Sequence, residues 1–259
     1  IMDIDERRKA IIDYLQYHPN CNVNQIIALF NVTPTTVRRD LTFLEQEGQI
    51  LRSHGSVHLK SSRPASDFSA RTQNFSAEKS AIAKASVQFV KPRDCVVLDS
   101  GTTVHAVAEA VSQIDNVVLI TNSLSIATTK SPAHEILLSG GVVDLDNLSL
   151  IGPDAEAFFK RISASVAFIG TTGIRNSTGP TVISPFFASI KRAMMACAEK
   201  KILVFDNSKL SPIGMVTFAD FSDFDAIIVS QPITDEALLR RFEESKVPVI
   251  VASDPSKNL

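Results

Sequence analysis

The 259 residues can fold as one large domain or as two smaller ones, and with 44% apolar residues they can bury a sizeable core. The formal net charge of −2 excludes a strongly basic polypeptide, so any contact with nucleic acid has to come from a local patch. No apolar run approaches the ~20 residues that cross a membrane, and the first residues do not resemble a signal peptide. We therefore expect a globular protein without membrane contact.

Three cysteines, Cys21, Cys95 and Cys197, lie far apart, each in an apolar run. Their number is odd and their spacing matches no metal site, so we expect three buried thiols in a reducing compartment. The sequence thus predicts a cytoplasmic protein with no metal, no cofactor and no catalytic cysteine.

Two helices are predicted at the start of the chain. Ile11 and Leu15 belong to an apolar helical stripe that ends before residue 20. Asn22 and Gln25 have the spacing of a capping box, in which Asn22 caps a helix over residues 23–30 and Gln25 reaches back.

A third helix begins after a short turn. Thr33 can cap it, and Pro34 suits its first turn, where no backbone donor is missed. Val37, Leu41 and Leu44 recur at i, i+4 and i+7 and predict a core-facing stripe. The polar positions near its start are of the types that contact bases and phosphates in helix-turn-helix proteins: Thr33, Thr35, Thr36, Arg38 and Arg39. A surface helix with two solvated arginines is the alternative, and the surrounding elements decide between the two.

A hairpin is predicted after the third helix. Two β-like runs flank His54 and Gly55, and a hairpin in this place is the wing of a winged helix. Arg52 and His54 are then placed to reach phosphates or a minor groove, although a neutral turn histidine is an equal alternative for His54. From Arg52 to Arg71 the basic residues outnumber the single acid, which supplies the local basic patch.

Together these motifs resemble the DeoR family of bacterial repressors. The similarity rests on an arginine near the start (Arg7 or Arg8), the run Thr33-x-x-Thr36-Val37-Arg38-Arg39-Asp40-Leu41 and the Arg-x-His-Gly sequence of the wing. The resemblance implies that the region of Arg38 and Arg39 contacts duplex operator DNA. Asp40 is expected to orient one of these two arginines by an ion pair. A winged helix that binds another protein is the alternative for this domain.

The composition changes after the wing. Residues 61–66 are small and polar and include a proline, which is typical of a linker. Phe68 and Phe75 indicate that the end of this stretch docks on one of the domains. We therefore expect a DNA-binding domain at residues 1–60, a linker at 61–77 and a second domain at 78–259.

The second domain alternates apolar strands with helices, starting with a helix over residues 78–90. The strands are predicted at residues 95–98, 117–120, 136–138, 166–169, 202–205, 226–229 and 247–251. Continuous apolar strands between helices favour an α/β fold with a mainly parallel sheet covered on both faces. In such sheets ligands bind at the carboxyl ends of the strands.

Loops rich in glycine, hydroxyl and charged residues follow five of these strands. They contain Asp99, Ser100, Gly101, Thr102, Thr103, then Thr121, Asn122, Ser123, then Gly140, Gly141, then Gly170, Thr171, and finally Asp206 and Lys209. Each loop alone is typical of an ordinary turn with a capping residue. Five such loops at one edge of the sheet supply backbone amides, hydroxyls, a carboxylate and an ammonium, as a phosphate site needs.

This array resembles the sugar-binding domain of the DeoR family, which is related in fold to ribose-5-phosphate isomerase. The resemblance implies that residues 100–103 cradle the phosphate of a sugar and that Lys209 supplies positive charge to it. Asp99 and Asn122 are expected to bond sugar hydroxyls or to order the loops. Lys191, in a predicted helix, is as compatible with a solvated position as with a ligand contact. A homo-oligomer, dimer or tetramer, is expected through this domain.

One position departs from the family pattern. Phe187 stands about four residues before the Lys-Arg-Ala-Met run that begins at Lys191, where family members commonly carry a glutamate. Phe187 cannot move protons, although it can stack on the apolar face of a sugar. The sequence thus favours a transcriptional regulator without catalytic activity, controlled by a phosphorylated sugar. A sugar-phosphate isomerase or deaminase with a DNA-binding appendage is the alternative, with Asp99 and Asp206 as its possible bases.

Overall fold

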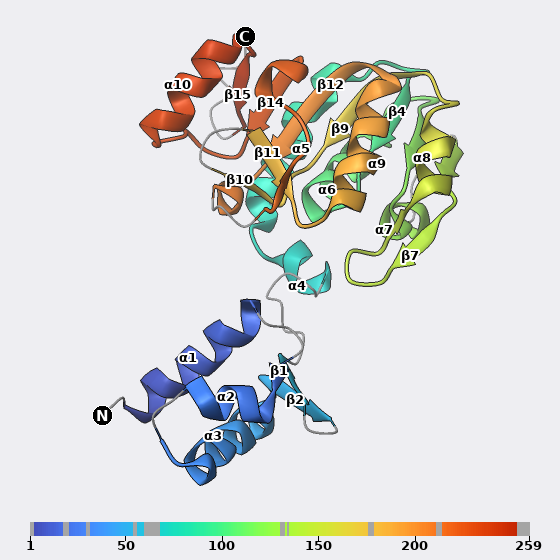
Figure 1. Ribbon diagram of the computed structural model, residues 1–259. Coiled ribbons are helices and arrows are strands. Elements are labelled where there is room, and N and C mark those ends of the chain that lie inside the picture. Colours follow the sequence, from blue (N-terminus) through green and yellow to red (C-terminus); the bar gives the residue numbers. More distant parts are fainter. Residues whose placement is uncertain are drawn as a thin grey trace. The chain divides into compact units, whose positions relative to one another are not determined.

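The computed structural model describes residues 3–17, 21–29, 32–53, 56–59, 68–129, 133, 135–175, 179–210 and 214–252. The chain divides into two compact units, Ile1–Ser66 and Asp67–Leu259. Figure 1 shows both units with their helices and strands.

The first unit is a winged helix. Its elements are α1 (Ile4–Tyr17), β1 (Cys21–Asn22), α2 (Val23–Leu29), α3 (Pro34–Gln46), β2 (Ile50–Ser53) and β3 (Ser56–Leu59). Strands β2 and β3 form the predicted hairpin, and β1 adds a short third strand beside β3 that was not predicted. The turn between β2 and β3, with His54 and Gly55, lies outside the described residues.

The predicted caps fix both short helices of this unit. The Asn22 carboxamide accepts a hydrogen bond from Asn24 N at 2.9 Å, and the Gln25 side chain accepts one from Asn22 N at 2.8 Å, which completes the capping box. Thr33 caps α3 by accepting from Thr36 N, with Pro34 in its first turn. Gly48 follows α3 with a φ of 70°, the left-handed conformation that ends many helices.

A single apolar cluster holds the winged helix together. It joins Ile11 of α1, Ile26 of α2, Val37 and Leu41 of α3, and Val57 of the hairpin, all of them buried. The stripe of α3 therefore faces the core as predicted, and its opposite side remains exposed.

The second unit contains a seven-stranded parallel sheet. Its order is β15-β14-β12-β9-β4-β5-β6, and the strands are β4 (Cys95–Leu98), β5 (Val118–Thr121), β6 (Glu135–Leu138), β9 (Ala164–Ile169), β12 (Ala198–Phe205), β14 (Ala226–Val229) and β15 (Val249–Val251). All seven were predicted; the largest difference is at β12, which begins four residues before the predicted start at residue 202. The chain places β5 and β6 on one side of β4 and β9 to β15 on the other, so the order reverses between β4 and β9. This is the topological switch point, where ligands of open α/β sheets bind.

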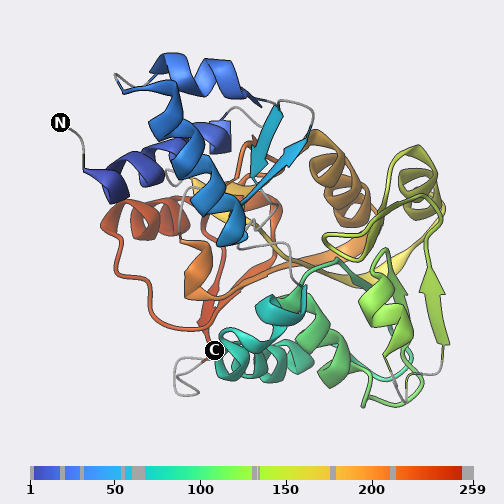
Figure 2. The ribbon, with the colours of Figure 1, turned by 90° about the horizontal axis from the view of Figure 1, so that it is seen from below.

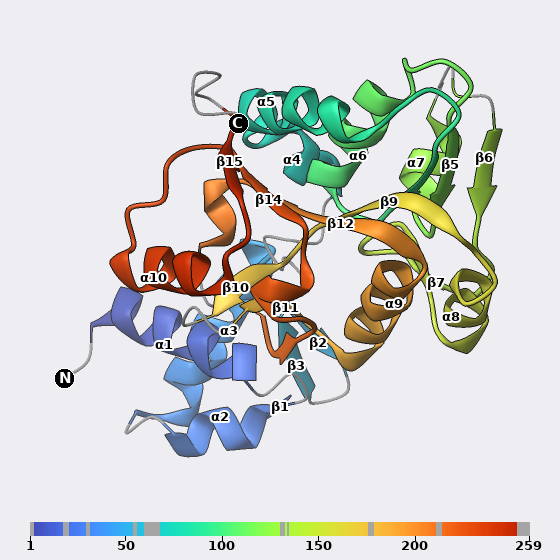
Figure 3. The same ribbon diagram turned by 90° about the horizontal axis from the view of Figure 1, so that it is seen from above.

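Side chains of successive strand residues enter two separate cores. In β9, Ala167 and Ile169 join one core, whereas Val166 and Phe168 join the other. The first core is closed by α8 (Pro153–Phe159), α9 (Pro185–Ala196) and α10 (Glu236–Ser245), and the second by α5 (Ser76–Ser86), α6 (Thr102–Val111) and α7 (Leu124–Thr128). Figure 3 shows α5 and α6 on one side of the sheet and α9 and α10 on the other, and Figure 2 shows the same layering from below.

In the described part of the second unit, five short strands lie outside the main sheet, and none was predicted. β7 (Val142–Asp144) pairs with β8 (Ser149–Ile151), and β10 (Gly173–Arg175), β11 (Gly179–Val182) and β13 (Val216–Thr217) form a small antiparallel sheet. They were missed because these stretches of two to four residues contain no run of three or more apolar residues, the signal by which the strands of the main sheet were recognised.

The linker expectation differs from the structure in its second half. Residues Phe68–Gln73 form the helix α4, which packs on α6 through an edge-to-face contact between Phe68 and His105. Phe75 precedes α5 and docks only in part: it is 49% exposed, and its ring centroid lies 5.7 Å from Lys79 Nζ. The buried-thiol expectation holds for Cys21, whereas Cys95 and Cys197 are partly exposed.

Candidate functional site

The exposed side of α3 carries most of the residues expected to contact DNA. Thr35, Arg38 and Arg39 are exposed at its N-terminal half. The hydroxyl groups of Thr33 and Thr36 lie 2.9 Å apart, in the cap of the helix. Arg52, on the wing, donates to the hydroxyl of Thr42 at 3.2 Å and lies 3.6 Å from the Glu45 carboxylate. Two arginines and a threonine thus face solvent together at the end of the helix that enters DNA in this motif.

The role expected for Asp40 is corrected by the structure. Its carboxylate is 3% exposed and accepts hydrogen bonds from Arg7 Nε at 2.6 Å and Arg8 Nε at 3.2 Å, both in α1. The prediction that Asp40 orients Arg38 or Arg39 is therefore wrong. A residue one position after Arg39 points to a different side of the helix, so Asp40 faces the core while the arginines face outward. Asp40 joins α3 to α1.

In the second unit, three predicted residues meet at the switch point. The Asp99 carboxylate accepts from Gly170 N at 2.9 Å and from the Lys191 ammonium. Lys191 also donates to Gly170 O at 3.0 Å. Both charged side chains are almost fully buried, so the solvated alternative for Lys191 is excluded. This ion pair ties the loops after β4 and β9 to α9, and it confirms the loop-ordering role of Asp99.

Phe187 lies one turn before Lys191 in α9. It is 9% exposed and packs in the apolar core of this face. A glutamate in its place would put a second carboxylate one helical turn from Lys191, whereas the phenylalanine leaves Asp99 to compensate Lys191.

The loop after β5 is buried and already engaged by the protein. Thr121 donates to Leu98 O at 2.6 Å, Asn122 donates to Leu150 O at 2.9 Å, and Ser123 caps α7. All three residues have 0% exposure. Their side chains therefore hold β4, β5 and β8 in register.

The glycines and threonines of the other loops have backbone roles. Gly141 has a φ of 127°, and a Cβ there would lie 2.6 Å from Ile151 O, whereas Gly140 is free of both constraints. Thr171 donates to Gly173 O and accepts from Thr181 N, which fixes the start of the small antiparallel sheet.

A cationic cluster lies at the carboxyl ends of β4 and β12. Asp206, 1% exposed, lies 3.7 Å from Lys79 Nζ and 3.5 Å from the Thr103 hydroxyl. Burial lowers the pKa of Lys79, against the opposing effect of Asp206. Burial also lowers the pKa of Lys209, and Arg71 lowers it further while Asp206 raises it. The cluster thus holds more cations than carboxylates, with Lys79, Lys209 and Arg71 against Asp206 and Glu78.

The start of α6 borders this cluster. Gly101 precedes the helix with a φ of 127°, and no side chain caps the first turn. The first amides of a helix lack partners within the helix and carry its positive dipole end. Thr102 and Thr103 are each 7% exposed at this position. Uncapped amides beside lysines form an arrangement that binds anions.

Lys79 was not among the residues predicted from the sequence. It lies on α5 in a stripe with Ile82, Ala83 and Ser86, at i, i+3, i+4 and i+7, and all four residues are buried. A lysine on a buried helical stripe is unusual unless it has a partner. That signal was present in the sequence and could have identified the residue.

Two family comparisons cover most of the chain. Residues 7–63 match the DeoR-like helix-turn-helix domain, and residues 74–231 match the DeoR C terminal sensor domain. The chain belongs to the DeoR family. It is therefore a transcriptional regulator with a DNA-binding domain and a sensor domain, and the relatives it matches are named as regulators and not as enzymes.

Relatives of known role extend over nearly the full length. The transcriptional repressor GlcR of Bacillus subtilis is 30% identical over 250 residues, which cover 95% of this chain and 96% of the relative. The glycerol-3-phosphate regulon repressor of Escherichia coli is 28% identical over 229 residues, covering 88% of this chain and 91% of the relative. In fold, the α/β unit resembles ribose 5-phosphate isomerase of Methanocaldococcus jannaschii, with 16% identity and a TM-score of 0.35 over 54% of this chain and 56% of the isomerase.

The described residues contain neither a membrane span nor a metal site. None of their helices has both the length and the apolar character needed to cross a membrane. Within the same residues, no group of three or more His, Cys, Asp or Glu side chains is arranged to hold a metal ion.

Proposed function

We propose that this DeoR-family regulator represses a carbohydrate-catabolism operon and that a phosphorylated sugar changes its affinity for operator DNA. The relatives above are repressors, and one is named for the regulon of a phosphorylated three-carbon compound. The proposal further assigns DNA contact to the exposed end of α3 and effector contact to the carboxyl edge of the sheet.

The cationic cluster carries the effector assignment. Lys79 and Lys209 are held in positions where burial disfavours their charged forms, and Asp206 compensates only part of that charge. A phosphate placed among Lys79, Lys209 and the start of α6 would supply the missing negative charge and accept hydrogen bonds from the uncapped amides. A neutral sugar can accept hydrogen bonds but cannot supply the negative charge.

Buried polar atoms near the ends of β5 and β6 support a sugar at the other end of the site. Among the described residues, Asn122 Oδ1, Ser139 Oγ and Ser149 Oγ are buried and have no hydrogen-bond partner. Buried polar atoms are normally paired with protein, water or ligand, because leaving one unpaired costs about 1–3 kcal/mol. Sugar hydroxyls, as donors and acceptors, suit such atoms.

Helix α4 connects the effector site to the chain that leads to the winged helix. Arg71 lowers the pKa of Lys209, and it donates to Asp146 O at 3.3 Å and Asn147 Oδ1 at 3.2 Å, in the turn between β7 and β8. A phosphate beside Lys209 attracts Arg71, so effector binding alters how α4 is held. If DNA-bound and effector-bound protein prefer different arrangements of α4, the effector weakens DNA binding. By linkage, DNA then weakens effector binding by the same coupling free energy.

Salt-dependent DNA binding tests the operator assignment. A duplex selected from a random pool by the native protein serves as the operator. Arg38→Ala and Arg39→Ala should each weaken binding, and the slope of log K against log salt should become shallower by about 0.9 for each phosphate that is no longer neutralised. Lys9→Ala removes an exposed charge from α1 and is the matched control. If both arginine variants bind as tightly as Lys9→Ala, α3 does not read DNA.

A panel of sugar phosphates tests the effector assignment by thermal shift and calorimetry. At least one compound should stabilise the native protein and change its affinity for the selected operator. Lys79→Met should weaken that binding at least tenfold, whereas Lys84→Met, exposed on the same helix, should leave it unchanged. If both variants bind the compound equally tightly, its phosphate does not bind at the cationic cluster. The assignment of DNA contact to α3 is unaffected by that result.

A further inference from the structure

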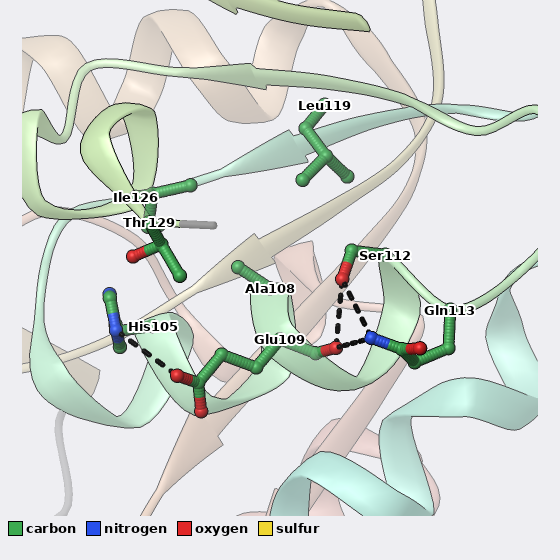
Figure 4. A pocket seen from close by; sticks show the side chains of 8 residues that line it. All are labelled: His105, Ala108, Glu109, Ser112, Gln113, Leu119, Ile126 and Thr129. Carbon is green, nitrogen blue, oxygen red and sulfur yellow. Dashed lines mark hydrogen bonds and ion pairs between the residues drawn. The ribbon is translucent and has the colours of Figure 1, made fainter. Parts of the chain in front are cut away.

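A pocket lies between α6, α7 and β5. It encloses about 260 Å³ and is lined by His105, Ala108, Glu109, Ser112, Gln113, Leu119, Ile126 and Thr129. In Figure 4, His105 and Thr129 lie at one end and Ser112 and Gln113 at the other. None of these residues belongs to the cationic cluster or to the loops assigned to the sugar phosphate, but His105 and Glu109 also line a neighbouring pocket with Lys79 and Thr102.

The pocket contains a polar atom that the protein leaves unsatisfied. His105 Nδ1 is buried and has no hydrogen-bond partner among the described residues, while His105 Nε2 faces the Glu109 carboxylate at 3.6 Å. Burial lowers the pKa of His105, so the imidazole is neutral at neutral pH and one nitrogen can accept a proton donor. An occupant with a hydroxyl group would satisfy Nδ1.

The described lining of this pocket disfavours a phosphate. None of its eight described lining residues is a lysine or an arginine, and Glu109 contributes a negative charge. A carboxylate accepts hydrogen bonds from two neighbouring hydroxyl groups, as in a vicinal diol. The pocket thus favours a ligand with neutral hydroxyl groups, whereas the cluster around Lys79 attracts anions.

The remaining lining residues give the pocket an apolar side and a polar side. Ala108, Leu119 and Ile126 form an apolar strip that suits the C–H face of a polyol. The hydroxyls of Ser112 and Thr129 are already hydrogen-bonded to Glu109 O and Ser125 O, so they retain acceptor capacity for ligand hydroxyls. The volume corresponds to a ligand no larger than a monosaccharide.

From this combination we infer that the pocket between α6 and α7 binds an uncharged monosaccharide or linear polyol, held by His105 and Glu109 and distinct from the phosphorylated effector. His105 also packs edge-on against Phe68 of α4, with the ring centroids 5.8 Å apart. The pocket therefore lies beside the same helix that connects the effector site to the winged helix.

Calorimetric titration of the full chain tests the inference. The probes are D-glucose, D-galactose, ribitol and sorbitol, with D-glucose 6-phosphate and ethanolamine as charged comparisons. At least one neutral probe should bind, and Glu109→Gln should weaken its binding about tenfold. The Glu109 side chain is 59% exposed, so this change is compatible with the fold. Glu236→Gln, an exposed glutamate on α10, is the matched control and should bind as the native chain does.

A second variant and a competition experiment separate this site from the effector site. Ala108→Leu fills the pocket and should abolish binding of the neutral probe. Saturating D-glucose 6-phosphate should not displace that probe competitively. The inference is overturned if no neutral probe binds, if ethanolamine binds in their place, if Glu109→Gln binds as the native chain does, or if the phosphate competes. The DNA and sugar-phosphate assignments stand or fall by their own experiments.

Discussion

The ion-pair network of Asp40 gives the sharpest prediction for the winged helix. Asp40→Asn keeps the size of the side chain and removes the charge that compensates Arg7, 5% exposed, and Arg8. Removing one partner of a buried ion pair costs about 3–5 kcal/mol, because the remaining charge stays buried. At about 0.05–0.15 kcal/mol per residue, a domain of some 60 residues has a total stability of only about 3–9 kcal/mol. The substitution should therefore remove most of the stability of this domain.

Hydrogen exchange of the full chain, followed by mass spectrometry, measures this loss locally. Amides of α1 and α3 should exchange about 100- to 4,000-fold faster in Asp40→Asn, since each 1.4 kcal/mol corresponds to a factor of ten. Peptides from the parallel sheet should keep their native protection. Glu47→Gln removes an exposed acid of the same unit and is the control. Exchange in α1 and α3 within threefold of the native rate would refute the reasoning.

Three further predictions concern the sensor unit. Gly141→Ala should destabilise it by about 2–4 kcal/mol in thermal unfolding, because the new Cβ would lie 2.6 Å from Ile151 O at a φ of 127°. Gly140→Ala is the control: its Cβ would have no atom within 4 Å, so the stability should change by under about 0.5 kcal/mol. Burial raises the pKa of Cys197 to about 11. The rate of its alkylation by iodoacetamide should therefore be low at pH 7 and should increase steeply only as the pH approaches 11. Fast labelling of Cys197 at pH 7 would contradict this prediction. Burial lowers the pKa of His105 below 6.5, so between that pKa and pH 6.5 the unfolded state binds more protons at His105 than the folded state does. The contribution of the neutral, buried His105 to stability is complete above pH 6.5 and is lost as the pH falls through the folded-state pKa. His105→Gln should flatten that acid dependence, and an unchanged profile would exclude His105 as its source.

The local signals of the sequence predicted the elements well. Caps at Asn22 and Thr33 and the stripe of Val37 and Leu41 involve residues within one or two helical turns, so their geometry follows from the backbone alone. Apolar runs of three or more residues likewise identified all seven strands of the parallel sheet. The family motifs are short and contiguous, and for that reason the chain was recognised from them.

Partnerships between distant residues were predicted less well. Asp40 was assigned to its sequence neighbours, but its partners lie 32 and 33 residues away in α1. Lys191 was left between two alternatives, and its partner Asp99 is 92 residues away. Lys79 was not considered, although its place on the helical stripe of Ile82 and Ala83 was visible in the sequence, because its partner Asp206 lies in a distant loop.

The sequence by itself determined the two domains, the order of their elements and the residue types at the edge of the sheet. Periodicity and capping act over a few residues, where the chain has few conformations to choose from. Only the tertiary structure decided which of those side chains are consumed in holding the fold, such as Asp99 with Lys191, and which lie beside incompletely compensated positive charge, such as Lys79 and Lys209. Burial and charge compensation depend on groups brought together by the whole fold, and no local pattern records them.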